Sequence, residues 1–83
     1  GPNHPDTATS LHNLGSLLMD LGRNEEAEKL LLRALAIFEQ SLGANHPNTL
    51  NTVRYLAELW KTMDNHAAVK KLKETYLPNK NPS

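Results

Sequence analysis

Apolar residues recur along the chain at intervals of three and four positions, the spacing that places side chains on one face of an α-helix. The first run comprises Leu11, Leu14, Leu18 and Leu21. A second run follows after a short polar interval and comprises Ala27, Leu30, Leu31, Ala34, Leu35 and Phe38. The pattern therefore predicts amphipathic helices, each of which buries one side.

The first half of the sequence returns in the second half. Residues 1–7 (GPNHPDT) match residues 43–49 (GANHPNT), which sets a period of 42 residues. Apolar pairs at the same offset include Leu11 and Val53, Leu14 and Leu56, Leu17 and Leu59, Leu21 and Met63, and Leu30 and Leu72. Self-similarity at a fixed period is typical of repeat proteins, and each unit contains two predicted helices.

Proline and glycine mark where the helices begin and end. Pro5 and Pro47 suit the first position of a helix, where a backbone N–H would have no partner. Gly22 can take the left-handed conformation that ends a helix, and Asn24 is expected to cap the next one. These signals predict helices at residues 5–21, 24–42, 47–63 and 66–77, and no strand. The side chains expected inside are Leu14, Leu18, Ala27, Leu31, Ala34, Leu56, Trp60 and Leu72.

The pair Leu14-Gly15, the turn residue Gly22 and the small residues Ala27 and Ala34 resemble the tetratricopeptide repeat, whose helix pairs interlock through small side chains. The usual repeat has about 34 residues. The longer period and the repeated His-Pro junction resemble the repeats of kinesin light chain and its relatives. The resemblance implies an all-α fold, an α-solenoid of two helix-turn-helix repeats whose four antiparallel helices stack with a right-handed superhelical twist.

The resemblance divides the chain into repeat 1 (residues 1–42), repeat 2 (43–78) and a polar tail (79–83). Lys73 and Tyr76 stand at the offsets of Leu31 and Ala34, so the last helix is more polar than its counterpart. We expect this face, which also carries Lys70, Lys71 and Glu74, to cap the end of an array. The alternative is an ordinary solvated face on an internal repeat.

Composition narrows the classes of function. Of the 83 residues, 39% are hydrophobic and 22% charged, as in globular proteins, and no window approaches the run of about 18 apolar residues that a membrane span requires. Lys plus Arg and Asp plus Glu number 9 each, so we expect neither nucleic acid nor a membrane as a partner. The start lacks a basic and apolar leader, and we expect a cytoplasmic location. Gly1-Pro2 is either the remnant of an expression tag or native, as the match of Gly1 to Gly43 indicates.

In tetratricopeptide arrays the first helix of each repeat lines the concave surface, so the resemblance assigns peptide binding to the polar side chains there. These are Thr9, His12, Asn13 and Ser16 in repeat 1, and Asn51, Arg54, Tyr55 and Glu58 in repeat 2. Asn13 is the leading candidate, because an amide pairs with both a donor and an acceptor of an extended peptide backbone. Arg54 could hold a carboxylate, although Arg54 and Lys61 do not make a full two-carboxylate clamp. The alternative is that all of these form an exposed polar face.

The histidines do not form a metal or catalytic pattern. His4 and His46 belong to the repeated junction, and His12 has no His or carboxylate three or four residues further on. Ser10 and Ser16 lie near His12 in sequence without the strained glycine turn of a nucleophile. With no cysteine in the chain, thiolate sites are excluded as well. We therefore expect no catalytic residues, no bound metal and no cofactor, and Trp60 is expected to pack in the core.

Two functions remain from the sequence. The first is a protein–protein interaction module that binds a peptide or partner protein on the concave face, and the second is an architectural or self-associating segment. The second helix carries a broad apolar set, Leu30, Leu31, Leu32, Leu35, Ile37 and Phe38. One neighbouring helix should not cover this set, and in a longer protein preceding repeats could do so. For the isolated chain we expect a homodimer, formed either by face-to-face packing or by exchange of helices through the junction at residues 43–45.

Overall fold

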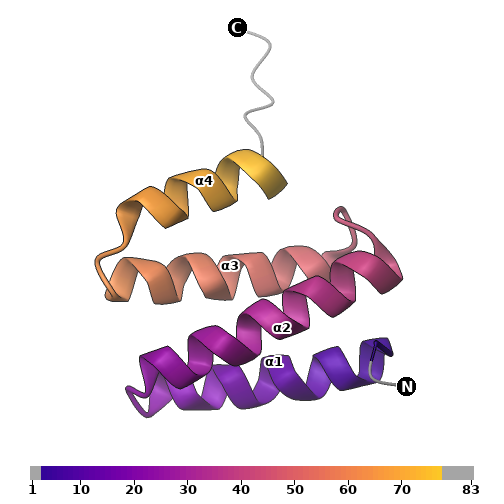
Figure 1. Cartoon of the computed structure of the whole chain (residues 1–83), viewed down its shortest axis with the longest axis horizontal. Coiled ribbons are helices and arrows are strands. Elements are labelled where there is room, and N and C mark those ends of the chain that lie inside the picture. The colour runs from indigo at the N-terminus through magenta and orange to yellow at the C-terminus, as the bar shows by residue number, and fades with distance from the viewer. Residues whose placement is uncertain (1–2, 78–83) are drawn as a thin grey trace, which may run out of the picture.

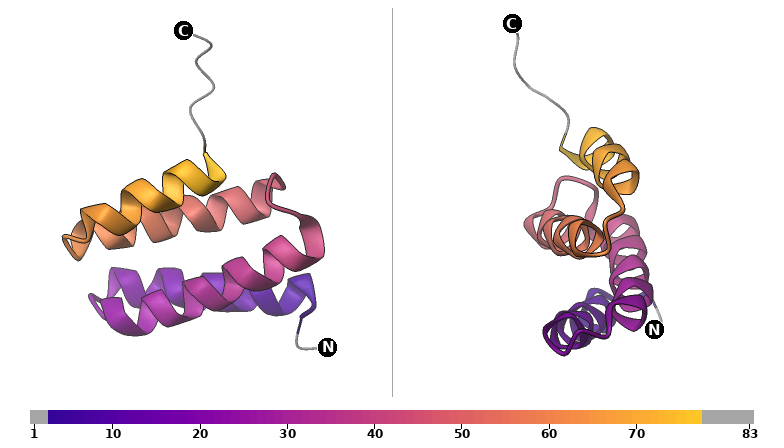
Figure 2. Two further views of the ribbon diagram at one scale, coloured as in Figure 1. Left: turned by 45° about the horizontal axis from the view of Figure 1, so that its top comes forward. Right: turned by 90° about the vertical axis from the view of Figure 1, so that its left-hand side faces the viewer.

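The computed structural model describes residues 3–77, and within them the chain forms four α-helices and no strand (Figure 1). The helices are α1 (Pro5–Asp20), α2 (Asn24–Leu42), α3 (Pro47–Thr62) and α4 (His66–Tyr76). Each bound lies within one residue of the prediction. The chain reverses direction at every turn, so neighbouring helices are antiparallel (Figures 1 and 2). The all-α repeat fold is thus confirmed, whereas Gly1-Pro2 and the tail at 79–83 lie outside the described residues.

The repeated histidine-proline junction is a helix start in both repeats. His4 and His46 have extended backbones, with ψ of 143° in each case. Their Nδ1 atoms accept hydrogen bonds of 3.0 Å from the backbone N–H groups of Asp6 and Asn48. Since these N–H groups have no partner within the helix, the histidine takes the place of the usual Ser, Thr, Asp or Asn cap.

The turn between α1 and α2 and the turn between α3 and α4 are formed by different residues. Gly22 has φ of 77°, as expected for a residue that ends α1, and its counterpart 42 positions later, Asp64, has φ of 63°. Aspartate tolerates this region better than most residues. Asn65 caps α4 by accepting a hydrogen bond from the Ala68 N–H. The predicted cap at Asn24 is wrong, because α2 begins at Asn24 itself and is preceded by Arg23, whose side chain forms no cap.

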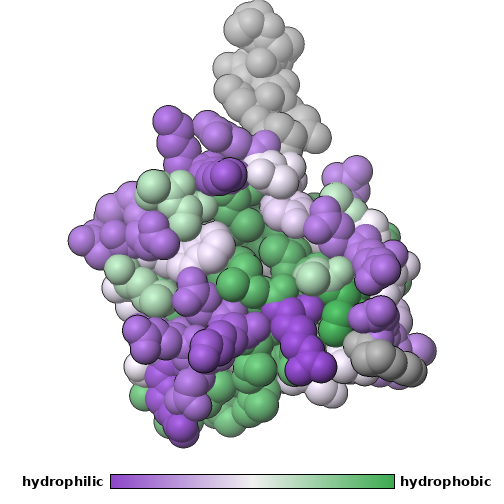
Figure 3. All heavy atoms as spheres, in the orientation of Figure 1, coloured by the Kyte–Doolittle hydropathy of each residue, from purple (hydrophilic) through white to green (hydrophobic). Residues whose placement is uncertain are grey.

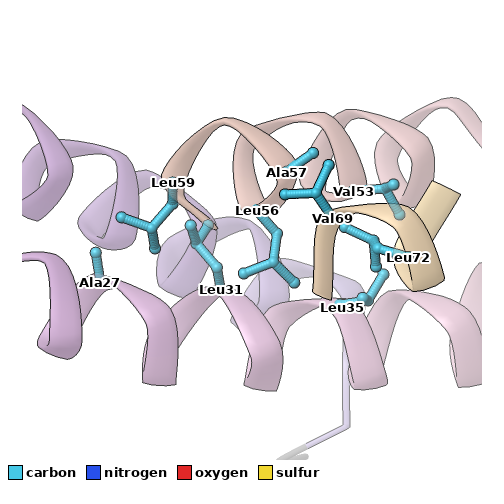
Figure 4. Packing of buried hydrophobic residues seen from close by; sticks show 9 residues of the cluster. All are labelled: Ala27, Leu31, Leu35, Val53, Leu56, Ala57, Leu59, Val69 and Leu72. Carbon is cyan, nitrogen blue, oxygen red and sulfur yellow. The ribbon is translucent and has the colours of Figure 1, made fainter. Parts of the chain in front are cut away.

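α2 lies between α1 and α3 and buries side chains against both. One cluster joins α2, α3 and α4, and Figure 4 shows Leu56 and Leu59 of α3 pointing toward Leu31 and its neighbours on α2. Its buried members are Ala27, Leu31, Leu35, Val53, Leu56, Ala57, Leu59, Val69 and Leu72. A second cluster joins α1 and α2 through Ala8, Ala34, Ile37 and Phe38. Because α2 has two neighbours, most of its broad apolar set is buried within the chain.

Small residues sit where α1 crosses α2. A Cβ atom added at Gly15 would lie 3.0 Å from the Cγ of Leu31, closer than most real contacts. Ala27 and Ala34 are fully buried. The sequence prediction of tight crossings at the two alanines is therefore confirmed, and Gly15 marks a further one.

We predict that Ala27→Leu lowers the free energy of unfolding by about 1–3 kcal/mol, because the added atoms have no room at a fully buried crossing. Urea denaturation followed by helical circular dichroism measures the change. Ala36→Leu, on the exposed side of the same helix, is the control and should change stability by about 0.5 kcal/mol or less. A more stable Ala27→Leu protein would contradict the packing.

Three predictions about the core need correction. Leu14 was expected inside but is 48% exposed, because no helix stands against α1 in the way that α2 stands against α3. Trp60 is only partly buried, packed at the edge of the larger cluster, where its Nε1–H donates to Glu28 Oε2 at 2.6 Å. An indole N–H at the rim of a core needs such a partner, which explains the position. Leu18 is also only partly buried.

A side-chain hydrogen bond fastens the last helix to the second one. The hydroxyl of Tyr76 in α4 donates to Glu39 Oε1 of α2 at 2.8 Å. Partial burial, followed by this bond and the nearby negative charge, raises the pKa of Tyr76 to about 12. The four polar residues predicted to cap the array, Lys70, Lys71, Lys73 and Glu74, are exposed, and their capping role stays a prediction.

Among the described residues, no helix combines the length and the apolar character needed to cross a membrane.

Candidate functional site

A hollow of about 280 Å³ lies between α1 and α3, and we call it the amide pocket. Its lining residues are Thr9, His12, Asn13, Phe38, Asn48, Asn51, Thr52 and Tyr55. α1 and α3 supply all of them except the buried ring of Phe38, which comes from α2. The pocket thus sits where the first helices of the two repeats meet.

The structure brings together most of the side chains predicted to bind a peptide. Five line the amide pocket: Thr9, His12, Asn13, Asn51 and Tyr55. Arg54 and Glu58 line a neighbouring hollow of about 320 Å³, which shares Asn51 and Tyr55 with the pocket. The two hollows therefore form one groove with an uncharged end and a charged end. Ser16, the remaining predicted residue, is half-buried and lines neither hollow.

His12 lines the groove at the predicted place, but most of its side chain is buried. It is 9% exposed, and its Nδ1 lies 2.9 Å from the Oγ1 of Thr52 on α3. Its ring meets that of Tyr55 edge-on, with ring centroids 4.7 Å apart and an interplanar angle of 68°. These contacts hold the imidazole in one orientation and connect the two repeats across the groove.

Burial also sets the charge of this histidine. Desolvation disfavours the protonated ring and lowers the pKa of His12 below its ordinary value of 6.5. The ring is therefore neutral at pH 7, with one nitrogen that donates and one that accepts.

Three asparagine side chains in the pocket have no hydrogen-bond partner among residues 3–77. They belong to Asn13, Asn48 and Asn51, all of which are exposed. Thr9, by contrast, already donates its hydroxyl to the Pro5 carbonyl at 3.1 Å. Each free amide offers both donors and an acceptor, so the pocket can pair with groups that have the same chemistry, such as peptide bonds.

Three lining residues were missed by the sequence analysis: Thr52, Asn48 and Phe38. Thr52 is fully buried, and its hydroxyl donates to the Asn48 carbonyl at 3.2 Å. The position of Thr52 in the sequence could have indicated its burial. Thr52 lies three positions after Thr49 and one before Val53, on the apolar stripe of α3, so a buried polar contact at this place was to be expected.

The charged end of the groove is only partly neutralised within the chain. Glu58 lies 3.9 Å from Lys61, both on exposed positions, and this pair is a weak surface interaction. Arg54 is exposed and pairs with no carboxylate among the residues described. Its guanidinium is thus free to bind an acidic group.

Within residues 3–77 no three His, Asp or Glu side chains come close enough to hold a metal ion. His66 pairs with Asp64 at 2.7 Å and His4 lies 3.7 Å from Asp6, both at exposed helix starts. In the described part of the chain, neither Ser10 nor Ser16 forms a hydrogen bond with the His12 ring, which bonds to Thr52 instead.

Comparison with known proteins agrees with this fold. The family model described as tetratricopeptide repeat matches residues 6–79. A "Clustered mitochondria protein homolog" from Coccidioides immitis is 31% identical over 77 residues, which is 92% of this chain and 6% of that protein. A homologue of the same name from Aspergillus oryzae shows the same identity and coverage.

"Protein KINESIN LIGHT CHAIN-RELATED 3" from Arabidopsis thaliana is 37% identical over 65 residues, which is 78% of this chain and 10% of that protein. The chain therefore spans about a tenth or less of the length of these relatives. Tetratricopeptide repeats generally mediate interactions between proteins. From the family match over most of its length, together with the helix pairs and their small-residue crossings, the chain belongs to the tetratricopeptide repeat family.

Proposed function

We propose that the groove between α1 and α3 binds an extended peptide segment of a partner protein. The observation that carries this proposal is the amide pocket, where three side-chain amides without partners lie beside a fixed neutral histidine. A peptide bond has one donor and one acceptor, and an asparagine amide pairs with both. Binding of this kind needs no chemical step and no cofactor.

The charged end of the groove gives the peptide a direction. Arg54 lies beyond Asn51 and Tyr55, so a peptide whose main chain occupies the amide pocket would place a nearby side chain or terminus at Arg54. An acidic group there forms a charge-assisted hydrogen bond. We therefore propose a ligand with an uncharged stretch followed by an Asp or Glu.

A peptide library displayed on phage and selected on the full chain tests this function. We expect one motif to be enriched, and its affinity to fall about tenfold in Asn13→Ala and in Arg54→Ala, the effect of losing one good hydrogen bond. Gln40→Ala, exposed on α2 away from the groove, is the matched control and should bind as wild type does. If no motif is enriched, or if Gln40→Ala weakens binding as much as Asn13→Ala, the groove is not the binding site.

Exposed leucines on α1 favour the alternative function, that of an architectural or self-associating segment. Leu14, Leu17 and Leu21 of α1 are 48%, 53% and 61% exposed, and we call them the leucine face. Their counterparts in repeat 2 include Leu56 and Leu59, which are 0% and 1% exposed because α2 covers them. Figure 3 shows apolar surface at the lower edge of the molecule, where Figure 1 places α1 and the start of α2.

Self-association was predicted through α2, but the exposed apolar surface lies on α1. The sequence placed the free apolar surface on α2, but Leu31, Leu35, Ile37 and Phe38 are buried inside the chain, and only Leu32 is markedly exposed. We propose instead that isolated chains dimerise through their leucine faces, which are self-complementary under a two-fold axis.

Sedimentation equilibrium over a wide range of concentration tests the dimer. We expect wild type to associate at hundreds of micromolar, and Leu17→Lys to sediment as a monomer of about 9.2 kDa with unchanged helicity. Leu32→Lys, which places the same charge on the exposed side of α2, should still associate. A wild-type chain that stays monomeric throughout would refute the dimer.

A cytoplasmic location also remains a proposal for this module, and subcellular fractionation with an antibody against the segment would test it.

A further inference from the structure

The hydrogen bonds around His12 determine which of its ring nitrogens carries the proton. Thr52 has a single hydroxyl proton, which it gives to the Asn48 carbonyl. Its oxygen must then accept in the contact with His12 Nδ1, 2.9 Å away. The Nδ1–H tautomer of the neutral ring is the one that satisfies both contacts of Thr52, and in this tautomer Nε2 holds a lone pair.

This lone pair belongs to an atom that reaches the surface. Among the described residues no buried side-chain nitrogen or oxygen lacks a hydrogen-bond partner. Nε2 of His12 has no partner within residues 3–77, so it is not a buried atom, although the residue as a whole is only 9% exposed. His12 lines the amide pocket, which is the hollow that this atom can open to. The protein therefore has one oriented acceptor on a residue that lines the uncharged end of the groove.

We propose that the amide pocket is a subsite for uncharged peptide main chain, in which His12 Nε2 accepts a hydrogen bond from a backbone N–H of the ligand. This inference rests on the proposed peptide-binding function and specifies its chemistry. A carbonyl or carboxylate oxygen opposite Nε2 would set two acceptors against each other. The subsite therefore selects a donor at this position, and an acidic residue of the ligand belongs at Arg54.

The surroundings of His12 favour the neutral acceptor. From α1 the pocket receives Thr9 and Asn13, and from α2 it receives Phe38, all uncharged. From α3 it receives Asn48, Asn51, Thr52 and Tyr55, of which only the phenol of Tyr55 titrates. Burial lowers the pKa of His12, so that the acceptor persists at neutral pH and is lost only on acidification below 6.5. Ligand binding should weaken in that range.

The first experiment needs no ligand. Long-range ¹H–¹⁵N correlation spectra of the full chain at pH 7.5 distinguish protonated from unprotonated ring nitrogens, and single His→Gln variants assign the four histidines. We expect His12 to show a protonated Nδ1 and an unprotonated Nε2. A protonated Nε2 at this pH would overturn the inference whatever the groove binds.

The second experiment uses N-acetyl-triglycine N-methylamide as a probe of uncharged main chain, with analogues that lack each N–H in turn. For wild type, we expect removal of one particular N–H to weaken binding at least about fivefold. His12→Asn keeps an amide that can donate to Thr52 but lacks the acceptor at the Nε2 position, so the same removal should there matter less than about twofold. An equal loss in both proteins would refute the role of Nε2.

Two further cases must be covered: a His12→Asn variant that does not fold, and a probe that does not bind to wild type. If His12→Asn loses its helical signal, wild type replaces it at a pH where the same ¹H–¹⁵N spectra show both ring nitrogens of His12 protonated, since protonation of Nε2 removes the same lone pair, and the N–H preference should vanish there. If the probe does not bind wild type even at tens of millimolar while the tautomer is as inferred, the subsite fails. Enrichment of a library motif that is insensitive to His12→Asn would leave peptide binding intact and reject only this inference.

Discussion

Replacing Leu31 with alanine is expected to lower the free energy of unfolding by about 2–5 kcal/mol. Leu31 is fully buried on α2, with Gly15 of α1 against one side and Leu56 of α3 in the same cluster on the other. The truncated side chain would leave a cavity between the two repeats. A chain of this size has about 4–12 kcal/mol of stability in total, so the loss is a large fraction of it.

Urea denaturation at several protein concentrations measures the effect, so that association does not contribute to the comparison. Leu32→Ala is the matched control: it removes the same atoms from the next residue of the same helix, where the side chain is 42% exposed. We expect a cost below about 1 kcal/mol there. Equal losses at the two positions would show that α2 does not pack as described.

Adding a second copy of residues 1–42 in front of the chain is expected to raise its stability by about 3 kcal/mol or more. The α2 segment of the added repeat would stand against the leucine face as α2 stands against Leu56 and Leu59. Three leucines that are now about half exposed would become buried, at about 1 kcal/mol each for the remaining half of the side chain. The midpoint of thermal unfolding gives a direct measure.

The matched control carries Leu17→Lys in the original chain, whose leucine face the added repeat is meant to cover. A lysine there cannot be buried without a large cost, so most of the gain should disappear. If the extended chain unfolds in two separate steps, with the original part as stable as before, then the added repeat does not dock and the leucine face has a different role.

The helix bounds could be predicted because their signals are local. Pro5 and Pro47 fix the starts, and Gly22 and Gly43, both with positive φ, fix the ends of α1 and α2. None of these depends on a distant part of the chain. The exception was Asn24, where a good capping residue was placed inside the helix instead of before it.

Burial in α1 could not be predicted from the same repeat pattern. Leu14 and Leu56 are equivalent in sequence, yet one is 48% exposed and the other 0%. The difference comes from the neighbour on one side, which α3 has and α1 lacks in this chain. A periodic sequence indicates which face is apolar, but it does not say which copy of that face is covered.

The groove could also be predicted only in part. Its position followed from the family resemblance, and Asn13 and Asn51 line it as expected. The partners of His12 did not follow, because Thr52 lies 40 residues away and meets it only when α1 and α3 come together. Hydrogen-bond direction, and hence the tautomer, is set by this tertiary contact and by a further bond within α3.

Because α2 packs against both α1 and α3, the 42-residue repeat of the sequence does not coincide with a piece of the chain that folds by itself. The sequence repeats at an interval of 42 residues, and although a small cluster lies within the first block, the larger cluster spans both, since Leu31 and Leu35 of the first block belong to the same cluster as Leu56 of the second. A cut at Gly43 would therefore divide one interior instead of releasing two domains. If recombination exchanges a whole repeat, the protein stays folded only when the new helix fits the surface of the neighbouring repeat. Adjacent repeats are therefore expected to change together over evolutionary time.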